Sequence, residues 1–398
     1  MTTTDRTAPN VFTGAQRARR YQEQASVNEQ DAGSAVLDLR DAAGDASGLS
    51  SASLHEAPAA APADPTQPRP APQTPVSVAP ATGTRPAQWG WRGRLSRGTA
   101  GLVKLAPEPA ELAHREALTT IRRATWTRAV NVIVTNPKGG SGKTPTALIL
   151  AGILGHVRGG YVAVWEAAES VGTLNQRAEG DPDRGLAELL AGVGDVRSAG
   201  TLGGYTAPQT SHADVIGSVG GRAVLTAADV LAARQVLDTY YRVTITDTGN
   251  NPGHEAYQAA LRTADAAVLP CLVSIDALAG LEEALAVMRV AGGQVAAPDG
   301  LVSRVVVVLG HDGGPEDSHI AAGLRARLEE LGVAAVVEVP FDPAIRLGGS
   351  ITLASLSEKS TRAWTAAAAA VVEALRTART DTDLVQQRQA TTTTGRQG

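Results

Sequence analysis

The sequence predicts an α/β protein in which a doubly wound, mostly parallel β-sheet is preceded by a disordered N-terminal arm. Between about residues 129 and 377, short apolar runs alternate with helical segments, which is the pattern of β-α-β crossovers. Several apolar runs are continuous instead of alternating, as expected for strands buried on both faces. The first 85 residues are rich in Ala, Pro, Thr, Ser, Gln and Asp, so they cannot bury enough apolar surface to offset the entropy of ordering.

Four regions follow from this composition. Nine Lys or Arg and only three Glu lie between Arg85 and Arg128, although the whole chain has a net charge of only −4. This basic segment ends in a predicted helix over residues 109–124, because its apolar side chains have i, i+3, i+4 spacing. We therefore expect a disordered Pro/Ala-rich arm, a basic Trp/Arg connector, a folded α/β domain and a polar disordered tail, at residues 1–85, 86–128, 129–377 and 378–398.

Within the domain, strands are predicted at seven apolar runs, and helices at the amphipathic segments between them. The expected strands are 130–135, 161–165, 222–225, 242–246, 265–270, 303–309 and 334–339. The expected helices are 144–157, 226–241, 254–263, 276–291, 317–331 and 353–376. In such a sheet, ligands bind at the carboxyl ends of the strands.

Several classes of protein are excluded by composition. The single cysteine, Cys271, rules out a disulfide framework and any cysteine-ligated cluster built by one chain. It also argues against a metal-cluster carrier on this fold. No stretch approaches the ~20 apolar residues of a membrane span, and the N-terminus lacks the apolar region of a signal peptide. We expect a cytoplasmic protein.

A phosphate-binding loop lies between the first predicted strand and its helix. Residues 138–144 are Lys-Gly-Gly-Ser-Gly-Lys-Thr, and the strand-loop-helix context is the one such a loop needs. Its glycines let backbone N–H groups approach phosphate oxygens. Lys143 is placed to reach the β and γ phosphates, and the Thr144 hydroxyl to ligate Mg²⁺. The residues expected to bind the nucleotide here are Gly139, Gly140, Ser141, Gly142, Lys143, Thr144 and Pro145.

The second motif is an acidic residue at the end of the strand predicted at 242–246. Asp247 follows this apolar run directly. An aspartate at the end of a neighbouring strand is the usual partner of a phosphate-binding loop in holding magnesium. The alternative, a helix-capping aspartate, is weakened by the loop upstream.

These motifs resemble those of the ParA/MinD group of deviant P-loop ATPases, over roughly residues 129–377. The resemblance rests on Lys138 together with Lys143, on Asp247, and on residues 340–342 after the last strand. It implies bound ATP and Mg²⁺ and a homodimer in which Lys138 reaches the partner's nucleotide. It also implies an adenine-side loop formed by Pro340, Phe341 and Asp342, with residues 309–311 nearby.

One catalytic element departs from the family pattern. Relatives carry Asp-x-Asp after the second strand, where the first acid helps the magnesium region and the second orients the attacking water. Here Glu166 aligns with the first acid, and Ala168 stands in place of the second. Glu169 is adjacent and could substitute, with a geometry shifted by one residue. Two functions remain open: an ATPase with Lys138, Lys143, Glu166 and Glu169 as catalytic residues, and a nucleotide-gated protein with little or no turnover.

The connector has its own resemblance. Its Trp89 and Trp91, among basic residues, resemble the N-terminal lead of actinobacterial MinD-like ATPases associated with type VII secretion. Such a segment could bind nucleic acid without sequence preference, an acidic protein or an anionic membrane surface, and a linker packed on the domain is an equal alternative. The implied roles are the positioning of plasmid or chromosomal DNA, or of a macromolecular complex, or service as an accessory to a secretion or conjugation system.

Overall fold

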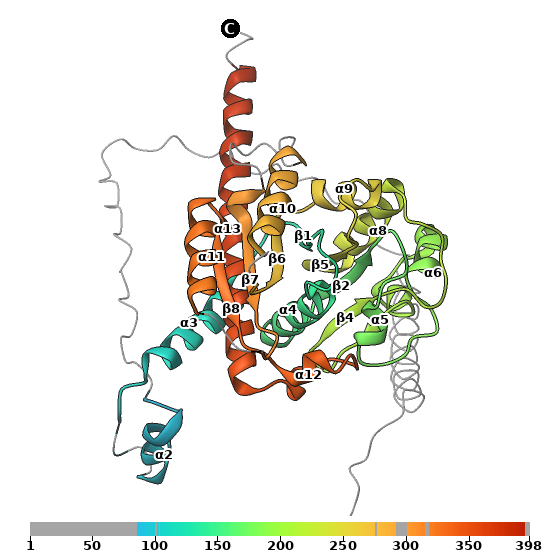
Figure 1. Cartoon of the computed structure of the whole chain (residues 1–398). Helices are drawn as coiled ribbons and strands as arrows, with labels where there is room; N and C mark the ends of the chain where they lie inside the picture. The colour runs from blue at the N-terminus through green and yellow to red at the C-terminus, as the bar shows by residue number, and fades with distance from the viewer. Residues whose placement is uncertain are drawn as a thin grey trace, which may run out of the picture. The chain divides into compact units, whose positions relative to one another are not determined.

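The computed structural model describes residues 86–99, 102, 104–274, 277–291, 301–314 and 318–394. Its strands form one eight-stranded sheet in the order β3-β4-β2-β5-β1-β6-β7-β8 (Figure 1). All neighbouring strands pair in parallel except the edge pair β3–β4, which is antiparallel. The strands are β1 Val130–Val134, β2 Val162–Ala167, β3 Ala207–Pro208, β4 Ala213–Ile216, β5 Val243–Thr248, β6 Ala266–Leu272, β7 Val305–Gly310 and β8 Ala335–Val339. The predicted doubly wound, mostly parallel α/β fold is confirmed.

Helices cover both faces of this sheet. Those that contribute most to the two cores are α3 Pro109–Arg123, α4 Lys143–Arg158, α8 Ala227–Tyr240, α9 Glu255–Arg262, α10 Ala277–Ala291, α11 Ser318–Glu330 and α13 Glu358–Thr394, whereas α2 Gly90–Gly98 has no residue in either core. Shorter ones are α5 Leu174–Arg177, α6 Leu186–Ala191, α7 Ala199–Gly203 and α12 Pro343–Arg346. Val132 and Val134 belong to a core shared with α3, α4 and α13, whereas Ile133 belongs to a core shared with α8, α9, α10 and α11. Successive residues of β1 are therefore buried on opposite faces, which is why four of its five residues are apolar.

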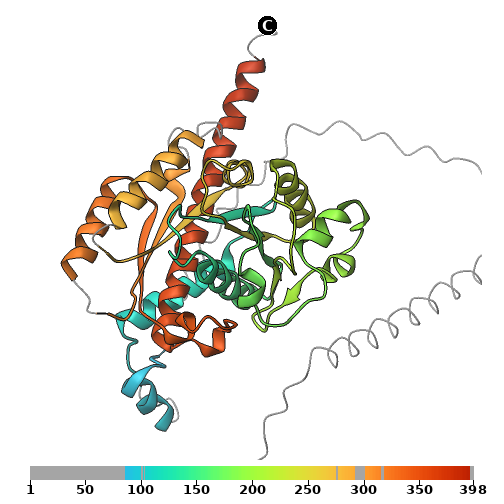
Figure 2. The same cartoon turned by 45° about the vertical axis from the view of Figure 1, so that its right-hand side comes forward.

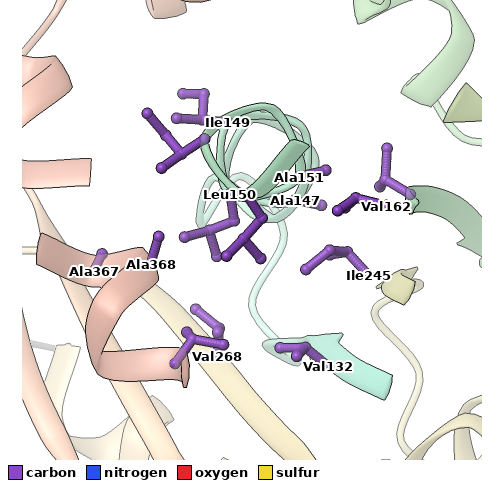
Figure 3. Close-up of a cluster of buried hydrophobic side chains, with 14 of the residues drawn as sticks. Val132, Ala147, Ile149, Leu150, Ala151, Val162, Ile245, Val268, Ala367 and Ala368 are labelled. Atoms are coloured by element: carbon purple, nitrogen blue, oxygen red, sulfur yellow. The ribbon is translucent and has the colours of Figure 1, made fainter. Parts of the chain in front are cut away.

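Helix α4 places the phosphate-binding loop, because its apolar side chains anchor it under the sheet. Leu150 lies among Val132, Val268 and Ala368, close to the helix α13 (Figure 3). All four of these residues are fully buried. Full burial of a Leu side chain contributes about 2 kcal/mol, so α4 has little freedom to tilt, and the loop at its N-terminus is held in place.

The connector contains helical structure before the predicted helix. Helix α2 was not predicted, and α3 confirms the helix predicted at 109–124. Ala117 and Ile121 of α3 are part of the domain core. The buried Glu111 carboxylate accepts hydrogen bonds from the backbone of Gln88 (2.8 Å) and Trp89 (3.3 Å), so the start of α2 is tied to α3. The division into regions at residues 85, 128 and 377 stays a prediction.

One predicted strand was wrong, and two strands of the sheet were not predicted. Residues 222–225 form a loop before α8, and the unpredicted strands β3 and β4 precede that loop in the chain. Of the apolar residues in that loop, Leu225 is buried but Val224 is 62% exposed, so the run does not line a two-sided core. β4 is only four residues long and contains Asp214, which hid it from a search for apolar runs.

The last helix begins later and ends later than its apolar pattern indicates. Residues 353–355 form a 3₁₀ turn, and α13 starts at Glu358. It runs to Thr394, past residue 377, and its end extends beyond the sheet (Figures 1 and 2). Within the described part of the chain, no helix combines the length and hydropathy needed to cross a membrane.

Candidate functional site: a phosphate-binding loop and its acidic neighbours

The phosphate-binding loop connects the end of β1 to the start of α4. Gly140 and Gly142 have φ angles of 72° and 89°, which is a left-handed backbone conformation that residues with a Cβ rarely adopt. Gly142 is the residue before α4, and the first turn of this helix contains no acidic side chain. The unpaired N–H groups and the positive end of the helix dipole therefore remain available to an anion.

Lys143 is held at the centre of this loop. Its ammonium donates to the carbonyl oxygens of Asn136 (2.9 Å) and Lys138 (3.3 Å) and to the side-chain oxygen of Asn250. Burial lowers the pKa of Lys143, and the carboxylates of Asp247 and Glu169 oppose this shift. A desolvated ammonium among polar acceptors at a helix N-terminus is suited to binding a phosphate group.

Thr144 and Asp247 lie together, as the sequence predicted for a magnesium site. The Thr144 hydroxyl donates to Asp247 Oδ2 at 2.7 Å. The second carboxylate oxygen, Asp247 Oδ1, is buried and has no hydrogen-bond partner. A hydroxyl beside a buried carboxylate with an unused oxygen fits the oxygen ligands that Mg²⁺ prefers. Among the described residues, no group of three or more His, Cys, Asp or Glu could hold a metal ion.

Asp247 has an unusual protonation equilibrium. Burial, assisted by the nearby Glu166 carboxylate, raises its pKa from 3.8 to about 7, against the opposing effects of Thr144 and Lys143. Between these two values the folded protein binds more protons than the unfolded chain. The free energy of unfolding therefore falls as pH rises through this window. Above about pH 7, Asp247 is ionised in the folded protein, and the full destabilisation by its buried charge is present.

The Asp247→Asn variant tests this cost. Without nucleotide or magnesium we expect it to be more stable than the wild type by about 2–4 kcal/mol at about pH 8, with a small difference at about pH 5. Urea unfolding at the two pH values measures both differences. The exposed Asp181→Asn change is the control. A stability difference that is the same at both pH values would show that Asp247 is not protonated in the folded protein near neutral pH.

Glu166 and Glu169 occupy different environments. Glu166 faces Asp247 across the β2–β5 pair, but its Oε1 accepts from Ser218 Oγ (2.6 Å) and from the Arg222 guanidinium (2.9 Å). Its second oxygen, Oε2, is buried without a partner. The Glu169 carboxylate packs against Gly249, and its Oε2 is also buried without a partner. Glu169 is therefore the less engaged acid beside the loop.

A cavity of about 460 Å³ is lined in part by the phosphate-binding loop. Its lining brings Gly140, Ser141, Gly142 and Pro145 together with Pro340, Phe341 and Asp342, as the sequence suggested. Arg346 lies over the Phe341 ring at 6.0 Å. The Asp342 carboxylate, however, accepts from the backbone N–H groups of Ala344 (3.0 Å) and Ser357 (2.9 Å), so it caps α12 and is not directed to a ligand.

The last of the predicted site residues is Lys138, at the start of the phosphate-binding loop. The Lys138 side chain is exposed, and its backbone N–H donates to the Asn136 side chain at 2.8 Å. Asn136 in turn donates to the carbonyl of Pro270 at 2.9 Å, which fixes the start of the loop to the end of β6. Sequence reasoning missed four residues of the site: Asn136, Asn250, Ser218 and Arg222. For Asn136 and Asn250, the only available signal was their position beside a motif.

Comparison with known proteins finds distant structural neighbours. No protein-family model matches the chain, and no curated protein matches it significantly. A ParA family ATPase from Chlorobium tepidum is 16% identical, with 60% of this chain and 96% of that chain covered, at a TM-score of 0.47. The cell division ATPase MinD of Pyrococcus furiosus is 20% identical, with 61% and 98% covered, at a TM-score of 0.45. MinD of Pyrococcus horikoshii, complexed with Mg-ADP, is 18% identical, with 60% and 94% covered, at 0.43. The likeness to these proteins is one of fold.

Proposed function

We propose that the protein is a magnesium-dependent, ATP-binding ATPase of the ParA/MinD type that works as an ATP-dependent dimeric switch. The observation that carries this proposal is the Thr144–Asp247 pair, with its unpartnered carboxylate oxygen, directly beside a phosphate-binding loop. The loop alone would suit many anions. Its combination with the half-buried Thr144 hydroxyl and the buried Asp247 carboxylate is suited to a phosphate chain that carries Mg²⁺.

The roles of the side chains follow from where they lie. Lys143 and the N–H groups at the start of α4 would stabilise phosphate charge, and Thr144 and Asp247 would hold magnesium. The metal would supply further neutralisation of charge on the transferring phosphoryl group. Of the two glutamates, Glu169 would orient the attacking water, and Glu166 would act near the magnesium while bound to Arg222.

The cavity beside the loop is large enough for the remainder of a nucleotide. Its volume of about 460 Å³ lies in the range of small-molecule sites. Pro340 and Phe341 present an apolar surface suited to a base, and Asp342 supports the loop through its caps. We propose adenine as the base because of the resemblance of this loop to the ParA/MinD group.

A second function, a nucleotide-gated protein that hydrolyses ATP slowly or not at all, is favoured by one observation. Ala168 stands where the water-orienting acid is expected, and Glu166 is already engaged by Ser218 and Arg222. Such a protein would serve as an accessory of a secretion or conjugation system. Hydrolysis under single-turnover conditions separates the two functions, since both require ATP binding.

The partners proposed for the switch are a second copy of the chain, non-specific DNA and a protein bound through the arm and connector, in the cytoplasm. Helix α2 supports a role for the connector. Its Arg94 and Arg97 are exposed, and Trp91 is 63% exposed. An exposed cationic surface with an aromatic side chain is suited to an anionic partner.

Dimerisation gives the direct test of the switch. We expect the wild type to form dimers with magnesium and a non-hydrolysable ATP analogue, and the Lys138→Ala variant to remain monomeric, because the exposed Lys138 would contact the partner's nucleotide. Analogue affinity in the monomer should change by less than about threefold, since a single exposed charge contributes little. Sedimentation velocity and equilibrium titration measure the two quantities. Lys359→Ala, an exposed lysine of α13, is the control. A wild type that stays monomeric with analogue bound, or a Lys138→Ala dimer of normal stability, would contradict the switch.

A further inference from the structure

The loop after β2, residues 168–170, is fastened by one buried side chain from another part of the chain. Arg222 lies in the segment between β4 and α8, and its side chain is only 2% exposed. It donates to the carbonyl oxygens of three successive residues, Ala168 (2.7 Å), Glu169 (3.3 Å) and Ser170 (2.9 Å). The guanidinium, with its five N–H donors in a fixed plane, is suited to gathering several acceptors in this way.

Arg222 is itself fixed from two sides. Its Nε donates to Ser218 Oγ at 2.8 Å, and a terminal nitrogen donates to the Glu166 carboxylate at 2.9 Å. Glu166 is 1% exposed and also accepts from Ser218 at 2.6 Å, so the three side chains form a closed network. Hydrogen bonds between charged groups in such a buried network are strong and directional.

The topology explains why these residues meet. β4 lies next to β2 and runs parallel to it, so both strands end at the same edge of the sheet. The chain that leaves β4 passes Ser218 and Arg222 before it starts α8, and this places it beside the chain that leaves β2. Gly172 follows in the same loop. A Cβ at this position would lie only 2.8 Å from the Glu166 carboxylate, so glycine leaves room for that carboxylate.

The result of this fastening is the position of Glu169. With its backbone carbonyl bound by Arg222, its carboxylate packs against Gly249, two residues beyond Asp247. The neighbouring Asn250 binds Lys143, so the Glu169 carboxylate lies at the border of the phosphate-binding loop. Its Oε2 is buried there without a hydrogen-bond partner, and an unsatisfied buried acceptor of this kind calls for a partner such as a bound water.

We propose that Arg222 is a positioning residue for hydrolysis, which holds the 168–170 loop so that Glu169, one residue later than the usual acid, reaches the attacking water. This inference rests on the proposed ATPase function. The Glu166–Arg222 pair then has a structural task, and the substitution of the usual second acid by Ala168 is compensated by the arginine clamp. Misplacement of a reacting group by about 1 Å can slow a reaction about 100-fold, so a clamp on this loop matters more for rate than for binding.

The test uses full-length Arg222→Gln, Arg222→Lys, Glu169→Gln and the double variant Arg222→Gln/Glu169→Gln. We expect Arg222→Gln to slow single-turnover ATP hydrolysis by about 30-fold or more, with the affinity for a fluorescent ATP analogue changed by less than about threefold. Arg222→Lys should recover little, because an ammonium cannot reach the same acceptors. The double variant should be no slower than Glu169→Gln within about twofold, because both changes act on one group.

Two further variants keep the test decisive. Ser218→Ala removes one support of Arg222 without leaving a buried charge unpaired, and it should slow hydrolysis by about 3- to 10-fold even if Arg222→Gln folds poorly. Arg327→Gln, an exposed arginine paired with Glu282 and Glu330, is the matched control and should have wild-type rates.

The outcomes separate this inference from the proposed function. An Arg222→Gln rate within twofold of the wild type, an equal loss of affinity and rate, or a double variant slowed by the product of the single effects would each overturn the clamp. A wild type that binds ATP without hydrolysing it would overturn it as well, while leaving nucleotide binding intact. A wild type that does not bind Mg-ATP would instead refute the proposed function.

Discussion

The Lys143→Ala variant is expected to bind ATP at least about 100-fold more weakly than the wild type, and to lose hydrolysis with it. Lys143 is 9% exposed, and its ammonium is the positive charge at the centre of the loop, bound to carbonyl and amide oxygens of Asn136, Lys138 and Asn250. Removal of a desolvated charge that binds phosphate costs about 3 kcal/mol, which corresponds to about 100-fold in affinity. Isothermal titration with Mg-ATP measures the effect.

The lysine on helix α13 provides the control for this result. Lys359→Ala removes an exposed ammonium far along the chain and should leave the affinity unchanged. The ligand-free stability of Lys143→Ala should stay close to that of the wild type, because burial lowers the pKa of this lysine and its charge is held at a cost. Tight ATP binding by Lys143→Ala would mean that the nucleotide binds elsewhere.

The second large effect is expected from a single added methyl group. In Gly249→Ala, the new Cβ would overlap the Glu169 carboxylate and push it away from the phosphate-binding loop. Gly249 does not have a left-handed backbone, so alanine is tolerated, and the overlapping atom is the mobile end of a side chain. We expect single-turnover hydrolysis to fall by about 10- to 100-fold, with ATP affinity and stability little changed.

This variant also separates the two candidate functions. Gly323→Ala adds the same methyl group where nothing lies within 4 Å, and should have no effect on hydrolysis. If Gly249→Ala hydrolyses ATP as fast as the wild type, Glu169 is not the acid that orients water. If neither protein hydrolyses ATP measurably while both bind it, the nucleotide-gated function is favoured.

Most of the fold was predictable because the signals are local. The strands β6 and β7 are continuous apolar runs, and the helices between the strands carry the expected periodicity. β4 was missed, because four residues with an aspartate give no clear pattern. The loop at 222–225 was mistaken for a strand, because apolar composition does not distinguish a covered loop from a two-sided strand.

The site divides in the same way. The phosphate-binding loop is one continuous segment whose chemistry depends on residue types at fixed spacing, so the sequence was enough to predict that Lys143, Thr144 and the strand-end Asp247 lie close together. The sequence could not determine which glutamate remains available. That was decided by the pairing of β2 with β4, which brings Arg222 onto Glu166 across 56 positions of the chain and turns Glu169 toward Gly249. A local motif can be read from residues that are adjacent in the sequence. A hydrogen bond between two loops forms only when the parallel strands place their carboxyl ends side by side, and the sequence does not show this directly.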